Sequence, residues 1–237
     1  MKGKTVLVSH HQLFEENRKK GFDVVPSQRQ EYSNAIAKCF IPCAQYILAG
    51  CFKVYNGNTK RTIRPTAIEL YYHEEGAGGF KDPIMYHTED RKAQYLASRG
   101  ITILPYFPLG SMNPHTSGID ITFENPSAQY RASFLIREYE LICDDGKPIY
   151  VKNSTDIYDD LLINGISLDD ADWVEWCDGE PLPVDMIERK WRRNVPEYVV
   201  SSGAWKKNDC VEGRESFSIS GTRYVKCPFD WQFRVKK

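Results

Sequence analysis

Hydrophobic positions recur along this chain with two periods, one typical of a helix and one typical of strands. From Ser27 to Leu48 apolar residues recur every three to four positions, which predicts an amphipathic helix that Pro42 kinks or breaks. Residues 51–75 form two strand-like runs on either side of the sequence Asn-Gly-Asn, a strong turn signal, and therefore predict a β-hairpin. The run 131–142 is apolar on both faces through its middle, which is typical of a central strand.

Shorter segments complete the predicted fold. Residues 101–107 and 118–124 are further strand-like runs, residues 87–100 and 154–168 have helical patterns, and the end of the chain, 223–237, alternates as a closing pair of strands. Strands and helices do not alternate regularly in this order, so a doubly wound parallel sheet does not fit. We predict an α+β fold, in which residues 31–237 form a single domain with a curved, mostly antiparallel β-sheet flanked by helices. Residues 1–30 are predicted to form an N-terminal extension packed on the main body.

Composition and charge narrow the function classes only a little. The chain has 237 residues, of which 41% are hydrophobic, enough for a substantial core without cross-links. No apolar run is long enough for a membrane span, and the start of the chain lacks the apolar stretch of a signal peptide, so we expect a cytoplasmic protein. The seven cysteines contain no CxxC pair, which argues against a disulfide framework or a zinc knuckle. A net charge of -1 is unusual for a protein that binds nucleic acid, and basic residues cluster only locally.

An acid, a phenol and an arginine stand out in the predicted sheet. Glu69 and Tyr71 are two positions apart in a strand, so their side chains point to the same face. Arg137 follows the apolar sequence Phe-Leu-Ile inside a strand that should be buried. A buried guanidinium without a partner is costly, so we expect Arg137 to pair with a carboxylate, and Glu69 is the candidate. The alternative is that Glu69 and Tyr71 lie side by side on an exposed face of the sheet and have no functional role.

Loop histidines and an aspartate add further candidate chemistry. His87 follows a glycine-rich segment, and His115 precedes a strand in which Asp120 occupies an early position. Together with His73 and Glu74, these residues offer enough nitrogen and oxygen ligands for zinc or iron, so a metal-dependent hydrolase is an alternative. Their spacing matches neither HExxH nor the deaminase pattern of HxE with a downstream PCxxC, and we predict no metal. The sequence contains no P-loop, GxSxG or GxGxxG, and no cofactor is expected.

The order of these elements resembles the alkyladenine (methylpurine) DNA glycosylases. The stretch IPCAQYILAGCFKVY resembles the family's opening helix and first strand, IELYY its E-A-Y strand, DPIMYH its histidine loop and ASFLIREYE its arginine strand. The stretches STDIYDDLLINGISL and PFDWQFRV resemble a later helix and the closing strand. The resemblance covers Ser33 to Val235 as an ordered series of short matches.

This resemblance implies a monomeric enzyme that hydrolyses an N-glycosidic bond and releases a modified purine base from DNA, as in base excision repair. Glu69 would be the general base that activates a water molecule, and Arg137 would help to hold that water and the acid. Tyr71 and His87 would form walls of a pocket for a flipped-out base. A base has to leave the stack before its glycosidic bond can be reached, and aromatic walls offset part of the unstacking energy.

The segment around His115 departs from the family pattern. The family has two tyrosines here, one on the pocket wall and one that wedges into the duplex, whereas this chain has His115 and Ser117. We expect His115 to lie at the mouth of the pocket in place of a stacking aromatic residue. Asp120 is expected to orient His115 or His87, so these residues are candidates for substrate binding.

Two further departures concern the substrate. Glu124 stands where the family has asparagine, and the helix that contacts the DNA backbone in the family is acidic here, with Asp156, Asp159 and Asp160. These departures predict altered substrate recognition, with a single strand, a free nucleoside or another N-glycoside in place of duplex DNA. The alternative is a scaffold of the same kind that has lost activity and binds nucleic acid or another ligand.

Overall fold

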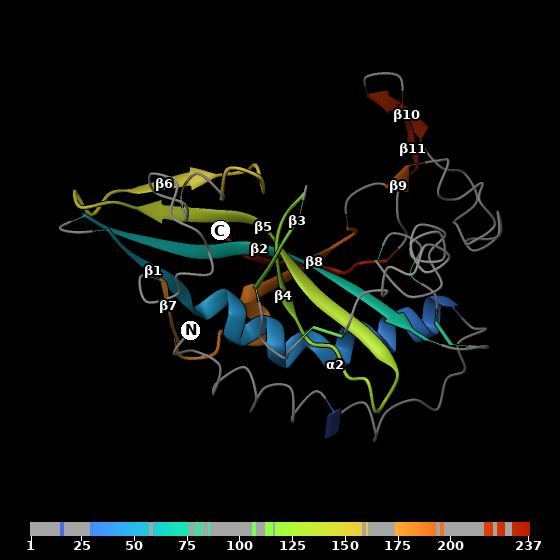
Figure 1. The fold of residues 1–237 in the computed structure, drawn as a ribbon. Helices are drawn as coiled ribbons and strands as arrows, with labels where there is room; N and C mark the ends of the chain where they lie inside the picture. The colour runs from blue at the N-terminus through green and yellow to red at the C-terminus, as the bar shows by residue number, and fades with distance from the viewer. Residues whose placement is uncertain are drawn as a thin grey trace, which may run out of the picture.

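The computed structural model describes residues 15–16, 29–56, 59–75, 79–80, 82, 85, 106–107, 112–115, 117–157, 160, 174–192, 195–196, 216–219, 222–225 and 229–237. Within them, one long helix packs across one face of a curled, antiparallel β-sheet of nine strands, and three short strands form a second sheet (Figure 1). The predicted α+β class and antiparallel sheet are therefore confirmed. Among these residues, no helix combines the length and the apolar composition that crossing a bilayer requires.

Helix α2 (Arg29–Ala49) forms from the predicted amphipathic stretch. Its buried residues recur every three or four positions and pack on the sheet, as Phe40 does edge-on against Phe134 with ring centroids 5.6 Å apart. Pro42 lies inside the helix and does not end it. Proline removes one backbone hydrogen bond from a helix, and burial of the sheet-facing side of α2 offsets that loss.

The hairpin predicted around Asn-Gly-Asn is confirmed. Strand β1 (Cys51–Asn56) pairs with strand β2 (Thr59–Glu74), and the register places Asn56 opposite Thr59. Strand β2 also pairs along most of its length with β5 (Tyr130–Ile142), from Thr62 opposite Ile142 to Glu74 opposite Tyr130. These two long strands form the middle of the curled sheet, as predicted for the apolar run of β5.

The remaining strands extend this centre on both sides. The order in the large sheet is β3-β4-β5-β2-β1-β7, with β6 paired to β5 and with β12 paired to both β2 and β8. Their bounds are Met112–His115 for β3, Gly118–Thr122 for β4, Pro148–Val151 for β6, Val174–Cys177 for β7, Ile187–Lys190 for β8 and Gln232–Val235 for β12. The small sheet has the order β10-β11-β9, with β9 at Val195–Pro196, β10 at Ser216–Ile219 and β11 at Thr222–Val225. A short 3-10 turn, Val184–Met186, precedes β8.

The two faces of the large sheet differ in chemistry. Successive side chains of a strand point to opposite faces, so Ile68, Leu70 and Tyr72 of β2 join the apolar core that packs under α2. Glu69 and His73 alternate with them and lie on the other face, yet both are fully buried. The face opposite α2 is therefore polar and enclosed, and we call it the polar face.

One predicted element is wrong and several lie outside the described residues. The end of the chain does not form a closing pair of strands, because β11 and β12 belong to different sheets. The helix predicted at 87–100, the residues 101–105 and most of the helix predicted at 154–168 lie outside the described residues. Glu15 accepts hydrogen bonds from Tyr130 and Asn125, so this residue contacts β5 and the turn before it.

Candidate active site on the polar face

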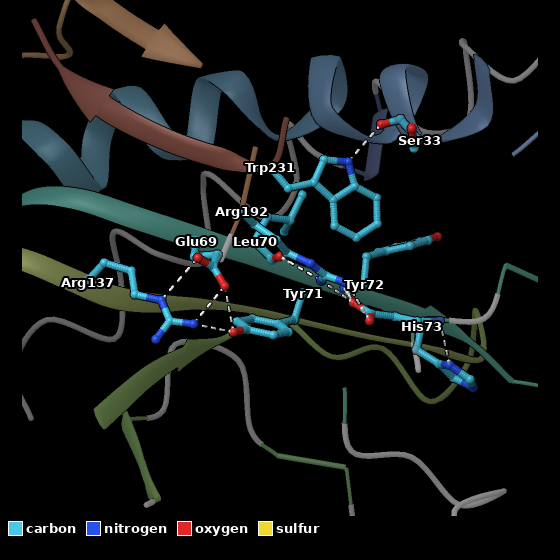
Figure 2. A network of polar contacts seen from close by, with 10 residues as sticks. Ser33, Glu69, Leu70, Tyr71, Tyr72, His73, Arg137, Arg192 and Trp231 are labelled. Carbon is cyan, nitrogen blue, oxygen red and sulfur yellow. Dashed lines mark hydrogen bonds and ion pairs between the residues drawn. The ribbon is translucent and has the colours of Figure 1, made fainter. Parts of the chain in front are cut away.

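Glu69, Tyr71 and Arg137 converge on the polar face (Figure 2). The Arg137 guanidinium donates to both oxygens of Glu69, from Nε to Oε2 at 3.1 Å and from Nη2 to Oε1 at 2.7 Å. The Tyr71 hydroxyl donates to Oε1 of Glu69 at 2.7 Å and accepts from Arg137 Nη2 at 2.7 Å. The pairing expected between Glu69 and Arg137 is therefore confirmed, and Tyr71 completes a closed triangle of polar contacts.

A β-bulge orients Arg137. In the register of β2 and β5, Ile136 lies opposite Ile68 and Glu138 lies opposite Ala67, which leaves Arg137 as the extra residue on β5. A bulge bends its strand and changes the direction of a side chain, and bulges are frequent next to active sites. The residue types of this segment predict a strand with a buried arginine, but they carry no signal for the bulge.

Both members of the ion pair are buried. The side chain of Glu69 is 0% exposed and that of Arg137 is 8% exposed. Burial and the adjacent carboxylate raise the pKa of Tyr71 well above its usual value, so the phenol remains a hydrogen-bond donor at neutral pH. Desolvation lowers the pKa of Arg137, but Tyr71 and Glu69 outweigh it and the net change is an increase. Such a carboxylate, held by two donors, can serve as a general base or orient a polar ligand.

Asp120 lies on the polar face beside this group. It is opposite Leu135 in the pairing of β4 with β5, and Leu135 is opposite Glu69 in the pairing of β5 with β2. Residues directly opposite one another share a face, so Asp120 and Glu69 are two strands, or about 10 Å, apart along one row. The negative charge of Asp120 also contributes to the raised pKa of Arg137. Asp120 is half-buried.

The two predicted pocket histidines are placed only in part. His115 is the last residue of β3 and lies opposite Gly118, where the chain turns back into β4 with a φ of 134° that favours glycine. The side chain of His115 and the whole of His87 lie outside the described residues. The roles expected for both histidines therefore remain predictions.

A second ion pair supports the ring of Tyr71. The Arg192 guanidinium lies 5.1 Å from the centroid of the Tyr71 ring and pairs with Asp82 in a bidentate contact, with distances of 2.6 and 2.8 Å. The Asp82 carboxylate also accepts from the backbone N–H of Tyr72 at 3.3 Å, and Arg192 donates to the Leu70 carbonyl at 3.4 Å. Sequence reasoning missed this pair, because its members are 110 residues apart and neither lies in a recognisable pattern.

A third buried network occupies the end of the polar face. Arg131 donates to Glu124 at 3.0 Å and to Glu75 at 2.8 Å, and its guanidinium lies over the Tyr106 ring at 4.2 Å from the centroid. Burial raises the pKa of Glu124 to about 7, although the Phe107 N–H and Arg131 act in the opposite direction. The rule that identified Arg137, a cation inside an apolar strand, applies equally to Arg131 and would have found this network.

The candidate metal ligands that the structure describes are not gathered together. His73 lies on the polar face, whereas Glu74 lies on the other side of β2 and accepts from the hydroxyls of Tyr32 at 2.6 Å and Tyr72 at 2.7 Å. Among the residues that the structure describes, no three His, Cys, Asp or Glu side chains form a group that could hold a metal ion.

The basic cluster IERKWRRN is largely paired with acids of the same chain. Its described pairs are Arg189 with Asp230 at 2.8 Å, Lys190 with Glu188 at 3.1 Å and Arg192 with Asp82 at 2.6 Å. Trp191 in the same cluster is 51% exposed. Carboxylates that neutralise these cations reduce the attraction of the cluster for phosphates.

The acidic segment after β6 is also partly engaged. Asp160 accepts from the Tyr139 hydroxyl at 2.6 Å and lies 3.7 Å from Arg61, so it turns toward the sheet. Asp156 is exposed, and Asp159 lies outside the described residues. Asp160 therefore has a structural role in anchoring this segment to β5.

Comparisons with known proteins give no relative for this chain: no protein-family model, no curated protein and no solved structure matches it. Its functional interpretation consequently depends on the geometry of Glu69, Tyr71 and Arg137 and on the resemblance of its sequence motifs to those of the alkyladenine DNA glycosylases.

Proposed function

We propose that this protein hydrolyses an N-glycosidic bond and releases a modified purine base from DNA. The observation that carries the proposal is the buried Glu69 carboxylate, which accepts hydrogen bonds from Arg137 and Tyr71 on the polar face. The resemblance to the alkyladenine DNA glycosylases assigns Glu69 and Arg137 to the hydrolytic centre and Tyr71 to a wall of the base pocket. Their contacts support the assignment, because a base that acts on water has to be fixed in direction.

In the proposed reaction, Glu69 takes a proton from a water molecule as the water oxygen bonds to the anomeric carbon of the sugar. The bond from that carbon to the base nitrogen breaks, and its electron pair leaves with the base. The sugar passes through an oxocarbenium-like state, which a nearby carboxylate stabilises. Arg137 keeps the carboxylate oriented through its two hydrogen bonds.

Recognition of the base is assigned to Tyr71, His87, His115 and Asp120. Tyr71 offers an aromatic ring whose position is supported by the Arg192 guanidinium, 5.1 Å from the ring centroid. The two histidines would stack on the base or hydrogen-bond to its edge, and Asp120 would orient one of them. We also propose that this chain adopts the fold of the methylpurine glycosylases.

The charge distribution favours a substrate other than intact duplex DNA. The net charge is -1, and the three described cations of the IERKWRRN cluster are paired with acids. A single strand, a nucleoside or another N-glycoside makes fewer phosphate contacts than a duplex and fits this surface better. We propose that the enzyme acts in the cytoplasm as a monomer and needs neither a metal nor a cofactor.

One observation favours a second function. Arg137 engages both oxygens of Glu69 in a closed, buried pair, a geometry that also serves a purely structural purpose. On that account the protein is a binding module for nucleic acid or another ligand on the same scaffold. Catalytic turnover separates the two functions, because a binding module retains its ligand unchanged.

The test is base release by the wild-type protein from alkylated and deaminated substrates, each offered as duplex DNA, as a single strand and as free nucleosides. We expect release of at least one modified purine that a metal chelator does not reduce. Loss of release on chelation, restored by added zinc or iron, would instead support the metal-dependent hydrolase. Binding of a substrate without release would support the binding module.

A further inference from the structure

Cys51 and Cys177 face each other across two paired strands. Cys51 begins β1 and Cys177 ends β7, and the antiparallel register places their Cα atoms directly opposite. Opposite residues of such a pair have Cα atoms about 4.5 or 5.5 Å apart, and a disulfide spans about 4.4 to 6.8 Å. Both thiols are free and half-exposed. The backbone thus holds the two Cα atoms at a separation that a disulfide accepts.

The neighbouring pair fixes this register. Phe52 lies opposite Trp176, and their rings pack edge-on in the core with centroids 4.7 Å apart. The indole also fills the space over Gly50, where an added Cβ would lie 2.1 Å from Trp176 Cζ2. A slip of β7 by one residue would move Trp176 out of the core, so the register is well determined. Because side chains alternate, Cys51 and Cys177 point away from that core.

A cation lies beside one of the sulfurs. Lys53 is two residues from Cys51 on the same face, and the interaction with Cys177 is the largest cause of its raised pKa. A neighbouring cation stabilises a thiolate, which is the form that attacks disulfides. Burial and the adjacent Cys177 raise the pKa of Cys51, whereas Lys53 and Arg64 lower it, and the net change is an increase. The raised pKa of Cys51 makes it the weaker nucleophile of the pair, so Cys51 is the resolving thiol and Cys177 attacks first.

We propose that Cys51 and Cys177 form a reversible disulfide that links β7 to β1. The oxidant is a small disulfide such as glutathione disulfide. The Cys177 thiolate attacks one sulfur of the oxidant, giving a mixed disulfide and releasing one glutathione thiolate. Cys51 then loses its proton to solvent and attacks the Cys177 sulfur, which forms the protein disulfide and releases the second glutathione. The protein thiols lose two electrons, and the oxidant gains both.

The other described cysteines are poorer candidates. Cys39 and Cys43 are both buried on α2, and burial and the adjacent Cys39 raise the pKa of Cys43 to about 12, which keeps it protonated. Cys143 is half-exposed and free, and it lies beyond the end of β5. It therefore serves as a matched control for the pair.

The proposed disulfide between Cys51 and Cys177 does not depend on the proposed glycosylase activity.

The experiment incubates the native, folded protein with a series of ratios of reduced to oxidised glutathione, alkylates the remaining thiols and maps the peptides by mass spectrometry. We expect wild type to yield a peptide that links Cys51 to Cys177 and to lose two alkylatable thiols. Cys143→Ser should give the same linked peptide. Reduction should restore both thiols. Alkylation of Cys51 and Cys177 at every ratio, or linkage of either to another cysteine, would overturn the proposal.

The two single variants test the order of the steps. Cys51→Ser should stop at a mixed disulfide, gaining one glutathionyl group on Cys177. Cys177→Ser should acquire glutathione on Cys51 about tenfold more slowly than Cys177 does in Cys51→Ser. Equal rates would contradict the assigned order of the two thiols. Formation of the disulfide is measured in the wild-type protein, so poor folding of a variant does not affect that result.

Discussion

Asp82 and Arg192 form a buried, bidentate ion pair that takes the place of a neighbouring strand along β2. The Asp82 carboxylate accepts the N–H of Tyr72, and the Arg192 guanidinium donates to the carbonyl of Leu70, so side chains complete the hydrogen bonding of this edge where β12 no longer pairs. Both side chains are 0% exposed. The pair thus holds the stretch of β2 that presents Tyr71 to Glu69.

We expect Asp82→Ala to lower the free energy of unfolding by about 3–5 kcal/mol, because it leaves the Arg192 cation buried without its carboxylate. Denaturant unfolding followed by circular dichroism measures this change. The control is Glu188→Ala, which breaks the exposed pair with Lys190, whose side chains are 50% and 43% exposed for Lys190 and Glu188. An exposed pair contributes about 0–1 kcal/mol. Equal losses in the two variants would contradict the role assigned to Asp82.

Tyr71→Phe keeps the ring and removes only the hydroxyl that joins Glu69 to Arg137. We expect a loss of stability of about 1–2 kcal/mol and a slower release of the base, because Glu69 loses one of its donors. Tyr72→Phe is a matched control on the opposite face, where the hydroxyl donates to Glu74 at 2.7 Å. It should cost similar stability and leave base release unchanged. Slower release in both variants would argue against a specific role for Tyr71.

Glu124 should make stability depend on pH. Burial raises its pKa from 4.5 to about 7 in the folded protein. Below pH 4.5 the carboxyl is protonated in both states; between pH 4.5 and 7 it ionises mainly in the unfolded chain, so folding stability falls as pH rises. The difference in the pKa of Glu124 between the folded and unfolded states corresponds to at most about 3 kcal/mol in the free energy of unfolding. Unfolding of wild type and Glu124→Gln between pH 4 and 8 tests this.

In that comparison, the stability of wild type relative to Glu124→Gln should decrease across the window and level off above pH 7. The glutamine cannot ionise and therefore lacks this contribution. A constant difference between the two proteins over the whole range would mean that the carboxyl of Glu124 titrates alike in the folded and unfolded states.

Sequence periodicity was sufficient for the local elements of this fold. The apolar spacing between Ser27 and Leu48 predicts α2, and the Asn-Gly-Asn signal predicts the hairpin of β1 and β2. Alternation places Glu69 and Tyr71 on one face, and the cost of a buried cation predicts the partner of Arg137. These predictions succeeded because each depends on neighbouring residues or on one dominant energetic rule.

The missed features depend on contacts between distant segments. Arg192 meets Asp82 across 110 residues, and Arg234 meets Glu138 across 96, with no local pattern to indicate either pair. The final strands were misassigned for the same reason, because alternation identifies a strand but not its partner. The bulge at Arg137 arises from the register of two long strands and has no signature in β5 alone.

The central claim is that Glu69 performs hydrolysis, and the chain contains a matched control for it. Glu138 has the same set of partners as Glu69: it accepts from Arg234 at 2.8 and 2.7 Å and from the Tyr150 hydroxyl. Changing either acid to glutamine removes one buried carboxylate from a contact with an arginine and a tyrosine. The two variants should therefore lose comparable stability.

The most direct measurement is the rate of base release by wild type, Glu69→Gln and Glu138→Gln on the modified substrate that wild type processes fastest, with folding of each protein verified by circular dichroism. We predict that Glu69→Gln loses release by about 100-fold or more, as expected for a general base, and that Glu138→Gln retains the wild-type rate. Release by Glu69→Gln at the wild-type rate would contradict the account.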